Sequence, residues 1–347
     1  MLMRALSISR PGGPDVLEMI EIPRPAPRTG TVLVRNHAVG VNFVETLIRR
    51  GKLPPTVVPT FPLIPGQEGA GVVVAMGDDV KGFAVGMRVM WMDDPFEAHG
   101  YAEYSLVRAN NAVPIADNVS FEVAAAVPVV HATARNQIYN LYGRAERAGR
   151  WALARNAAGG AGTALVETAT AAGLKVIAVA SKQKLAFARA HGAVETIDYK
   201  TENVPDRVRA ITGGEGVALA LNPIGGDTVL EDLNLLAPLG HLILYGLITG
   251  MPTGDVWAAM MQRITAGLTV SVASIDAYMR HCPREFRRIL EDIAGDLAAG
   301  RITPSIFETL PLSEGSRAHS MLESGASTGK LVFKMSQDVC AVAACAE

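Results

Sequence analysis

Residues 151–162 read Trp-Ala-Leu-Ala-Arg-Asn-Ala-Ala-Gly-Gly-Ala-Gly, and residues 175–184 read Lys-Val-Ile-Ala-Val-Ala-Ser-Lys-Gln-Lys. The first stretch has the pattern of a strand and a glycine turn; an apolar helix over 163–172 and a second buried strand follow it. Glycines in such a turn allow a tight bend and the close approach of a pyrophosphate to the helix start. A glycine cluster alone also fits an ordinary turn. The strand, helix and second strand around it predict a dinucleotide-binding unit.

The end of the second strand indicates which dinucleotide would bind. An Asp or Glu at this place accepts a hydrogen bond from a ribose 2′-hydroxyl but repels a 2′-phosphate. This chain has Ser181, Lys182 and Lys184 instead, and all three can donate to a phosphate. The lysines also fit a solvated helix start, which stays open as an alternative. The pattern predicts NADPH rather than NADH.

Composition excludes several classes of partner. The chain has 347 residues with 49% hydrophobic and 19% charged residues, which allows two domains with cores of their own. A net charge of −2 gives no electrostatic reason to expect nucleic acid or an anionic membrane as partner. No apolar run has membrane-spanning length and the start lacks a signal-peptide core, so we expect a cytoplasmic protein. Cys282, Cys340 and Cys345 are too few and too irregular for a disulfide framework or a Cys-rich zinc loop.

The chain contains two kinds of sequence. Up to about residue 125 its short apolar runs between Pro and Gly residues are typical of an all-β unit with one helix. From about residue 121 helices alternate with buried strands, which predicts an α/β fold with a doubly wound parallel sheet. The first part is expected to form strands over 31–35, 69–75 and 87–91 and a helix over 43–50. The second is expected to form strands over 151–155, 176–180, 196–198, 217–221 and 241–245, with helices over 183–190, 204–211 and 229–236.

The last part returns to strand texture after a charged helix over 285–299, with strands expected over 307–311 and 330–333. We therefore expect this part to fold back onto the first domain and to leave a cleft between the two domains. The tail over 336–347 is rich in small residues and is expected to be loosely held.

A series of short motifs resembles a known family. In chain order they are Pro11-Gly-Gly-Pro-Asp-Val-Leu17, Val39-Gly-Val-Asn42-Phe-Val-Glu45, Pro65-Gly-Gln-Glu68-Gly-Ala-Gly71, Gly100-Tyr-Ala-Glu-Tyr104, Ala157-Ala-Gly-Gly-Ala-Gly162, Ile197-Asp-Tyr199, Ile224-Gly-Gly226, Ala318-His-Ser-Met-Leu-Glu-Ser-Gly325 and Gly329-Lys-Leu-Val332. From Met3 to Met335 the chain resembles the zinc-independent quinone oxidoreductase (zeta-crystallin-like) branch of the medium-chain dehydrogenase/reductase superfamily. The resemblance implies a GroES-like β-rich catalytic domain over 1–128 and 275–347 and a Rossmann NADPH-binding domain over 129–274. It also implies reduction of a quinone or an activated double bond.

The resemblance also assigns cofactor-binding roles by position. The residues expected to face the nicotinamide are Asn42 and Thr133; those expected at the pyrophosphate are Gly159, Gly160, Ala161 and Gly162. Ser181, Lys184 and Tyr199 are expected to read the 2′-phosphate, with Lys182 beside them. Tyr245 and Gly246 are expected to line the dinucleotide path, and Lys330 is a further candidate contact.

Zinc is not expected. A catalytic zinc needs thiolate, imidazole or carboxylate ligands around an open position. The places where zinc enzymes of the superfamily carry a cysteine and a histidine hold Phe43 and Gln67 here. The seven histidines are scattered without ligand spacing.

Without a metal, hydrogen-bond donors aimed at the acceptor oxygen would stabilise the charge that develops there. Relatives often carry tyrosines where this chain has Leu47 and Leu53, so the usual phenol donors are missing. The candidate catalytic residues are Asn42, Arg49, Lys52, Tyr101, His131 and Arg135, each of which also fits a packing or surface role. His131 and Arg135 depart from the family pattern, as do Asn156 before the glycine turn and Asn222, where an acid is common; Asn156 can still support a tight bend.

Three functions stay open. The first is an NADPH-dependent reductase of a small hydrophobic quinone or enone. The second is an enoyl-thioester reductase of a fatty-acid or polyketide pathway, and the third is a cofactor-binding protein with little turnover. Residues 267–273 have the alternation of an apolar edge strand, which a twin chain would cover, so we expect a homodimer.

Overall fold

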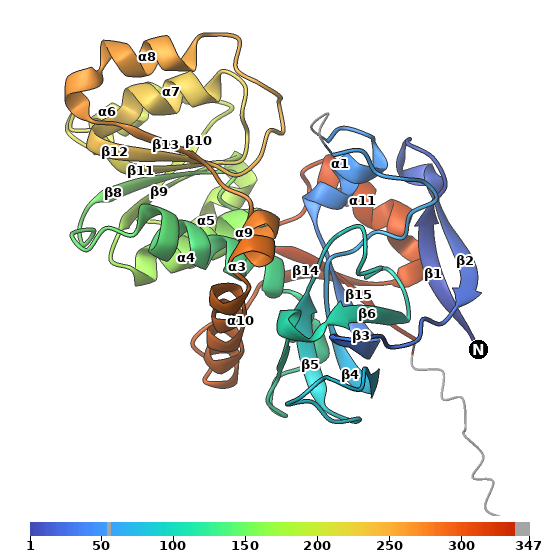
Figure 1. Cartoon of the computed structure of the whole chain (residues 1–347). Coiled ribbons are helices and arrows are strands. Elements are labelled where there is room, and N and C mark those ends of the chain that lie inside the picture. The colour runs from blue at the N-terminus through green and yellow to red at the C-terminus, as the bar shows by residue number, and fades with distance from the viewer. Residues whose placement is uncertain (54–56, 337–347) are drawn as a thin grey trace, which may run out of the picture.

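The computed structural model describes residues 1–53 and 57–336. It consists of two lobes, each built around its own sheet, with helices α3, α9 and α10 near the seam between them (Figure 1). Two of the three cysteines, Cys340 and Cys345, lie outside the described residues. The tail that we expect to be loosely held also lies outside them beyond Ser336. Cys282 is a free, partly buried thiol.

The lobe formed by the middle of the chain contains a parallel sheet of six strands in the order β10-β9-β8-β11-β12-β13. This is the order of a doubly wound dinucleotide-binding fold, and it confirms the fold predicted from the sequence. The strands are β8 (Trp151–Arg155), β9 (Lys175–Ala180), β10 (Glu195–Asp198), β11 (Val217–Asn222), β12 (Leu236–Leu244) and β13 (Thr269–Val272).

Helices cover both faces of this sheet (Figure 1). On one side lie α6 (Val204–Ile211), α7 (Thr228–Leu235) and α8 (Val256–Gln262); on the other lie α3 (Pro128–Arg135), α4 (Gly160–Ala171) and α5 (Leu185–Ala190). The central strand β11 is fully buried between these helices, whereas no residue of the edge strand β13 is buried. Helix α8 was not among the helices predicted from the sequence.

The second lobe contains a mixed sheet in the order β14-β15-β3-β4-β5-β7, with β6 also paired to β3, and a separate hairpin of β1 and β2. The strands are β1 (Leu2–Ile8), β2 (Leu17–Pro23), β3 (Thr31–Val41), β4 (Glu68–Met76), β5 (Arg88–Met92), β6 (Tyr104–Arg108), β7 (Ala112–Pro114), β14 (Ile306–Pro311) and β15 (Lys330–Lys334). Strand β15 pairs antiparallel with β3, Leu331 opposite Val41. This pairing confirms that the last part of the chain folds back onto the first domain.

The remaining helices of this lobe are α1 (Phe43–Arg49), α2 (Phe121–Ala125), α9 (Ile275–His281), α10 (Pro283–Ala298) and α11 (Gly315–Glu323). Helix α10 buries Phe286, Leu290 and Ile293 in a core shared with α3 and the strands β4, β5 and β7. None of the described helices combines the length and the apolar character needed to cross a membrane.

Candidate cofactor and substrate site

The glycine turn has the geometry that a pyrophosphate requires. Strand β8 ends at Arg155, and Asn156 takes a left-handed backbone with φ of 53°. Helix α4 begins at Gly160 with Gly159 as N-cap, and no side chain caps it. A Cβ on Gly162 would lie 2.1 Å from the carbonyl oxygen of Asn156, so only glycine fits there. The uncapped helix start leaves backbone N–H groups for an anion, and a pyrophosphate fits this cradle.

The residues predicted to read the 2′-phosphate lie at the ends of two paired strands. Tyr199 follows β10, and its N–H donates to Ala180 at the end of β9 at 3.3 Å, which places it beside Ser181. The Tyr199 side chain is 55% exposed and is free to contact a ligand. The structure therefore places Tyr199 beside Ser181, and their binding of a 2′-phosphate stays a prediction.

The two lysines of this region differ. The Lys184 ammonium donates to the carbonyl oxygens of Gly325 and Ser327, each at 2.6 Å, and so joins the Rossmann lobe to the loop before β15. An ammonium group has three donors, so one remains for a phosphate. Burial lowers the pKa of Lys184. Lys182 is exposed.

The ends of the central strands lie at the same edge of the sheet as the glycine turn. Strand β11 lies between β8 and β12, and the Tyr245 N–H donates to the Asn222 carbonyl at 3.1 Å. A Cβ on Gly246 would lie 2.6 Å from the Pro223 carbonyl oxygen, so this turn needs glycine. Burial raises the pKa of Tyr245, which keeps its phenol protonated. The side chain of Asn222 accepts from the N–H groups of Ile224 and Gly225 at 2.8 and 3.1 Å, so the amide supports the turn.

A buried polar group, which we call the Glu68 cluster, lies on the GroES-like side of the seam and consists of Asn42, Glu45, Glu68 and Lys330. The Lys330 ammonium donates to Glu68 Oε1 at 2.6 Å, to Asn42 Oδ1 at 2.7 Å and to the Val41 carbonyl at 3.0 Å. Asn42 Nδ2 donates to Glu68 Oε1 at 2.8 Å. All four side chains are at least nine-tenths buried. Lys330 thus has all three donors engaged, and the orientation of the Asn42 amide is fixed.

A second polar chain supports the cluster from behind. Arg49 Nε donates to His319 Nδ1 at 3.1 Å, and His319 Nε2 lies 3.1 Å from the Tyr101 hydroxyl, which donates to Glu45 at 2.5 Å. The arginine donor assigns the imidazole hydrogen to Nε2, so every hydrogen bond in the chain has one direction. Glu45 accepts in turn from the Asn42 N–H at 2.7 Å. The chain therefore fixes the start of α1, where Asn42 precedes the helix.

Burial controls the ionisation of these groups. Burial raises the pKa of Glu45 to about 7, although the hydrogen bond from Tyr101 opposes the shift. Burial also raises the pKa of Tyr101 well above its usual value, and it lowers the pKa of His319 to about 3. His319 is thus neutral near pH 7. Among Arg49, His319, Tyr101 and Glu45, the group that titrates near pH 7 is Glu45.

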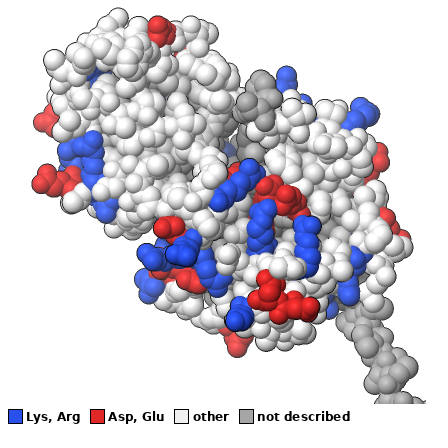
Figure 2. Space-filling model, viewed as in Figure 1, with Lys and Arg blue, Asp and Glu red and all other residues white. Residues whose placement is uncertain are grey.

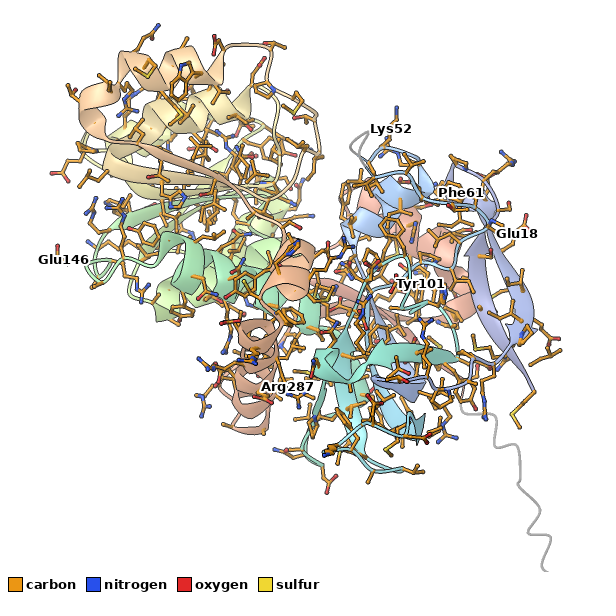
Figure 3. The ribbon with its side chains drawn as sticks, in the orientation of Figure 1. Glu18, Lys52, Phe61, Tyr101, Glu146 and Arg287 are labelled. Carbon is orange, nitrogen blue, oxygen red and sulfur yellow. The ribbon has the colours of Figure 1, made fainter. Side chains whose placement is uncertain are left out.

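Most of the candidate catalytic residues direct their hydrogen-bond donors to partners within the protein. Tyr101 lies inside the β-rich lobe (Figure 3) and is fully buried, with its hydroxyl engaged as described. Arg49 is also fully buried and pairs with Glu323, while Arg135 pairs with Asp296. Lys52 is exposed at the outer edge of the lobe (Figure 3). These placements favour packing and pairing roles for Tyr101, Arg49 and Arg135.

Two further predicted residues lie on α3. His131 is 3% exposed and faces a small cavity behind the glycine turn. Thr133 is partly buried. Sequence reasoning missed Glu45, Glu68 and His319. The signal for Glu45 was the spacing of Asn42 and Glu45, which is that of a capping box with Asn at the N-cap.

Phe43 and Gln67 stand at the positions that the resemblance assigns to zinc ligands in zinc enzymes of the superfamily. Phe43 is the first residue of α1, and Gln67 directly precedes β4. The Gln67 side-chain oxygen is buried and has no hydrogen-bond partner among the described residues. Within residues 1–53 and 57–336, no three His, Cys, Asp or Glu side chains are grouped as metal ligands.

Comparisons with known proteins agree with this architecture. Residues 28–117 match the family described as alcohol dehydrogenase GroES-like domain, and residues 160–294 match the family described as zinc-binding dehydrogenase. A quinone oxidoreductase of Pseudomonas aeruginosa is 35% identical over 93% of this chain and 96% of its own length. The quinone oxidoreductase of Rattus norvegicus is 30% identical over 96% of this chain and 98% of its own length.

Solved structures show the same fold. The quinone oxidoreductase of Escherichia coli complexed with NADPH has a TM-score of 0.87 and 29% identity, covering 95% of this chain and 99% of that one. The quinone oxidoreductase of Pseudomonas syringae has a TM-score of 0.87 and 32% identity, covering 96% and 99%. The chain therefore belongs to the quinone oxidoreductase-like branch of the medium-chain dehydrogenase/reductase superfamily, with a GroES-like domain and a Rossmann domain.

Proposed function

We propose that this protein is an NADPH-dependent reductase of small hydrophobic quinones or enones that works without zinc. The observation that carries the proposal is the convergence of Ser181, Lys184 and Tyr199 near an uncapped helix start. The residue at the end of β9 is Ser181. An acidic residue at this place would repel a 2′-phosphate. The relative of known structure from Escherichia coli that is complexed with NADPH supports the same cofactor.

The residues present fit this cofactor. The turn of Gly159, Gly160, Ala161 and Gly162 would hold the pyrophosphate through its backbone N–H groups. Ser181, Lys182, Lys184 and Tyr199 would hold the 2′-phosphate, and Tyr245 with Gly246 would line the path between them. Asn42 and Thr133 would orient the nicotinamide, with Lys330 acting through its hydrogen bond to Asn42. When bound, NADPH supplies the hydride.

The acceptor side explains why a quinone or an enone suits the site. Phe43 and Gln67 occupy the places of zinc ligands, and neither can polarise a substrate through a metal. Arg49, Tyr101 and Arg135 have donors committed to partners in the protein. Quinones and enones need little polarisation, because the charge that hydride addition creates is delocalised onto oxygen. The anion can take its proton from water.

Steady-state assays with NADPH or NADH and a panel of quinones, enones and enoyl thioesters test the proposal. We expect NADPH oxidation with quinones or enones and a clear preference over NADH. Inductively coupled plasma analysis should detect no bound zinc; one tightly bound zinc per chain would contradict the zinc-independent mechanism. Turnover of enoyl thioesters alone would favour the second candidate, a reductase of a fatty-acid or polyketide pathway.

One observation favours the third candidate, a cofactor-binding protein with little turnover. The side chains of the Glu68 cluster and of the polar chain behind it are hydrogen bonded to each other. Binding of NADPH without its oxidation by any acceptor of the panel would support this candidate.

We also propose a homodimer and the domain limits given above, with 129–274 as the Rossmann domain. Among the described strands, β13 lies at the edge of the six-stranded sheet. Its Val272 side chain is 85% exposed, and Trp257 and Ile264 nearby in sequence are 68% and 65% exposed. Figure 2 shows a largely uncharged surface over this part of the lobe. Light scattering at micromolar concentration should give the mass of a dimer, whereas a monomeric mass would contradict it. The cytoplasmic location stays a prediction.

A further inference from the structure

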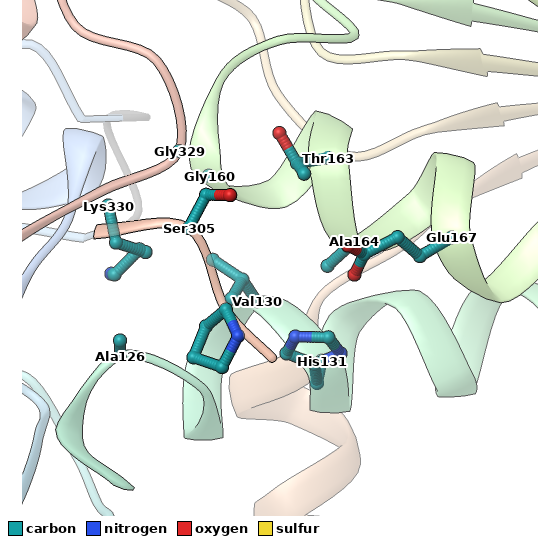
Figure 4. Close-up of a pocket in the computed structure, with 11 residues that line it drawn as sticks. Ala126, Val130, His131, Gly160, Thr163, Ala164, Glu167, Ser305, Gly329 and Lys330 are labelled. Atoms are coloured by element: carbon teal, nitrogen blue, oxygen red, sulfur yellow. The ribbon is translucent and has the colours of Figure 1, made fainter. Parts of the chain in front are cut away.

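A small cavity with both apolar and polar wall residues lies behind the glycine turn, between the two lobes (Figure 4). Its walls come from α3, from one face of α4 and from the segments around Ser305 and Lys330. Its volume is about 10 Å³, which is close to the room that one water molecule needs. The residues that matter for its chemistry are His131, Glu167 and Ser305.

Two of these residues belong to a hydrogen-bonded chain. The Glu167 carboxylate lies 2.7 Å from His191 Nδ1, and His191 Nε2 lies 2.9 Å from the Ser305 hydroxyl. The order of carboxylate, imidazole and hydroxyl is that of an activated nucleophile. The adjacent cavity, however, is too small for an acyl substrate. The chain instead links α4 and the end of α5 in the Rossmann lobe to the segment before β14.

His131 is the third polar wall of the cavity. It is 3% exposed, and its ring has no hydrogen-bond partner within residues 1–53 and 57–336. Burial lowers its pKa to about 4, with the nearby Arg135 adding to the shift. The ring is therefore neutral near pH 7 and has one N–H donor and one acceptor nitrogen. A buried polar group without a partner destabilises the fold, so the ring needs one.

We propose that the cavity binds one ordered water molecule, held by the His131 ring, the Glu167 carboxylate and the Ser305 hydroxyl. The carboxylate has an oxygen that His191 does not engage, and the serine oxygen keeps lone pairs when its hydrogen points to His191. A water with partners on three sides meets the usual requirement of a buried site. The water connects α3, α4 and the segment at Ser305, directly behind Gly160. It holds the helix that carries the pyrophosphate turn against the GroES-like lobe.

A high-resolution crystal structure of the full chain is the direct test. We expect one density peak in the cavity within hydrogen-bond distance of His131 and of Glu167 or Ser305. Nuclear Overhauser transfer from water to the His131 ring protons gives an independent readout in solution. An empty cavity together with no transfer would overturn the proposal.

His131→Leu separates a wet cavity from a dry one. If the water is present, leucine expels it and leaves Glu167 and Ser305 without that partner, so Tm falls by about 2 °C or more. If the cavity is dry, leucine removes an unsatisfied imidazole, so Tm rises. His281→Leu, at an exposed position, is the matched control and should leave Tm nearly unchanged. A rise in Tm for His131→Leu would contradict the proposal.

Discussion

The glycine turn of the Rossmann lobe and the Glu68 cluster of the GroES-like lobe differ in how their polar groups are used. The turn begins a helix that no side chain caps, so backbone donors remain for a ligand. In the cluster, Lys330 donates to three partners within the protein. Unused donors reveal the chemistry of a ligand, whereas satisfied ones reveal only how the site is held. For this reason the proposal for the cofactor is more specific than the proposal for the acceptor.

Lys330→Met should lower the free energy of unfolding most, because it disrupts the Glu68 cluster. The change leaves the buried Glu68 carboxylate without its cation, which costs about 3–5 kcal/mol of unfolding free energy. Urea unfolding measures the loss. Lys334→Met, on the same strand, removes an exposed partner of Glu122 and should cost less than about 1 kcal/mol. Equal losses for the two variants would mean that Lys330 is not a structural cation.

Gly162→Ala would close the open side. The new Cβ would lie 2.1 Å from the Asn156 carbonyl oxygen, so the turn must shift and its donors lose their alignment. We expect NADPH affinity measured by fluorescence titration to fall about 100-fold, or roughly 2.7 kcal/mol. Gly295→Ala in α10, where a Cβ has open space, is the control and should bind as the parent does.

The pKa of Glu45, about 7 against a usual 4.5, gives the Glu68 cluster a pH dependence. Between these values the folded protein holds the proton more tightly than the unfolded chain, so this contribution to stability falls as pH rises from 4.5 to 7. We expect the unfolding free energy of the parent, relative to Glu45→Gln, to fall by about 1 kcal/mol per pH unit in that window.

His131 and His319 act in the opposite sense, because burial lowers their pKa and stability then rises with pH. Both remain in the Glu45→Gln variant, so their contributions cancel in the comparison. A difference that stays constant from pH 4.5 to 7 would show that Glu45 does not titrate there.

Lys184→Met tests the smallest expected effect. A hydrogen bond to a charged group contributes about 1.5–3 kcal/mol, so the preference for NADPH over NADH should fall about tenfold. The measurement is kcat/KM with each cofactor. Lys182→Met is the matched control, since Lys182 is exposed and lies two residues away. An equal loss of the NADPH preference in both variants would contradict a specific role of Lys184 in binding the 2′-phosphate.

Most of the parallel sheet could be predicted, because buried parallel strands are continuous apolar runs between helices. Strand β8 and helix α6 have the predicted limits. The hairpin of β1 and β2 was not predicted, although its two strands are neighbours in the sequence. The full length of β3 was missed because it depends on pairing with β4 and β6, which lie farther along the chain. The length of β12 was missed for the same reason: Leu236 begins it only because β11 lies alongside.

The candidate site divides in the same way. The glycines, Ser181 and Tyr199 follow strand ends, where the βαβ pattern alone fixes their position. Glu68 and Lys330, 262 residues apart, meet only through the pairing of β15 with β3. His319 and Arg49, 270 residues apart, meet where α11 packs against α1.

The sequence by itself determined the family, the order of strands and helices in the Rossmann domain and the position of the glycine turn. These depend on short-range pattern and on glycine, whose backbone freedom is local. The tertiary structure alone decided which side chains have donors left for a ligand. By residue type, Tyr101, Arg49 and Arg135 were all candidate donors to the acceptor. Burial and partners from distant segments turned them into supports of the fold, because a buried polar group must find its hydrogen bonds within the protein.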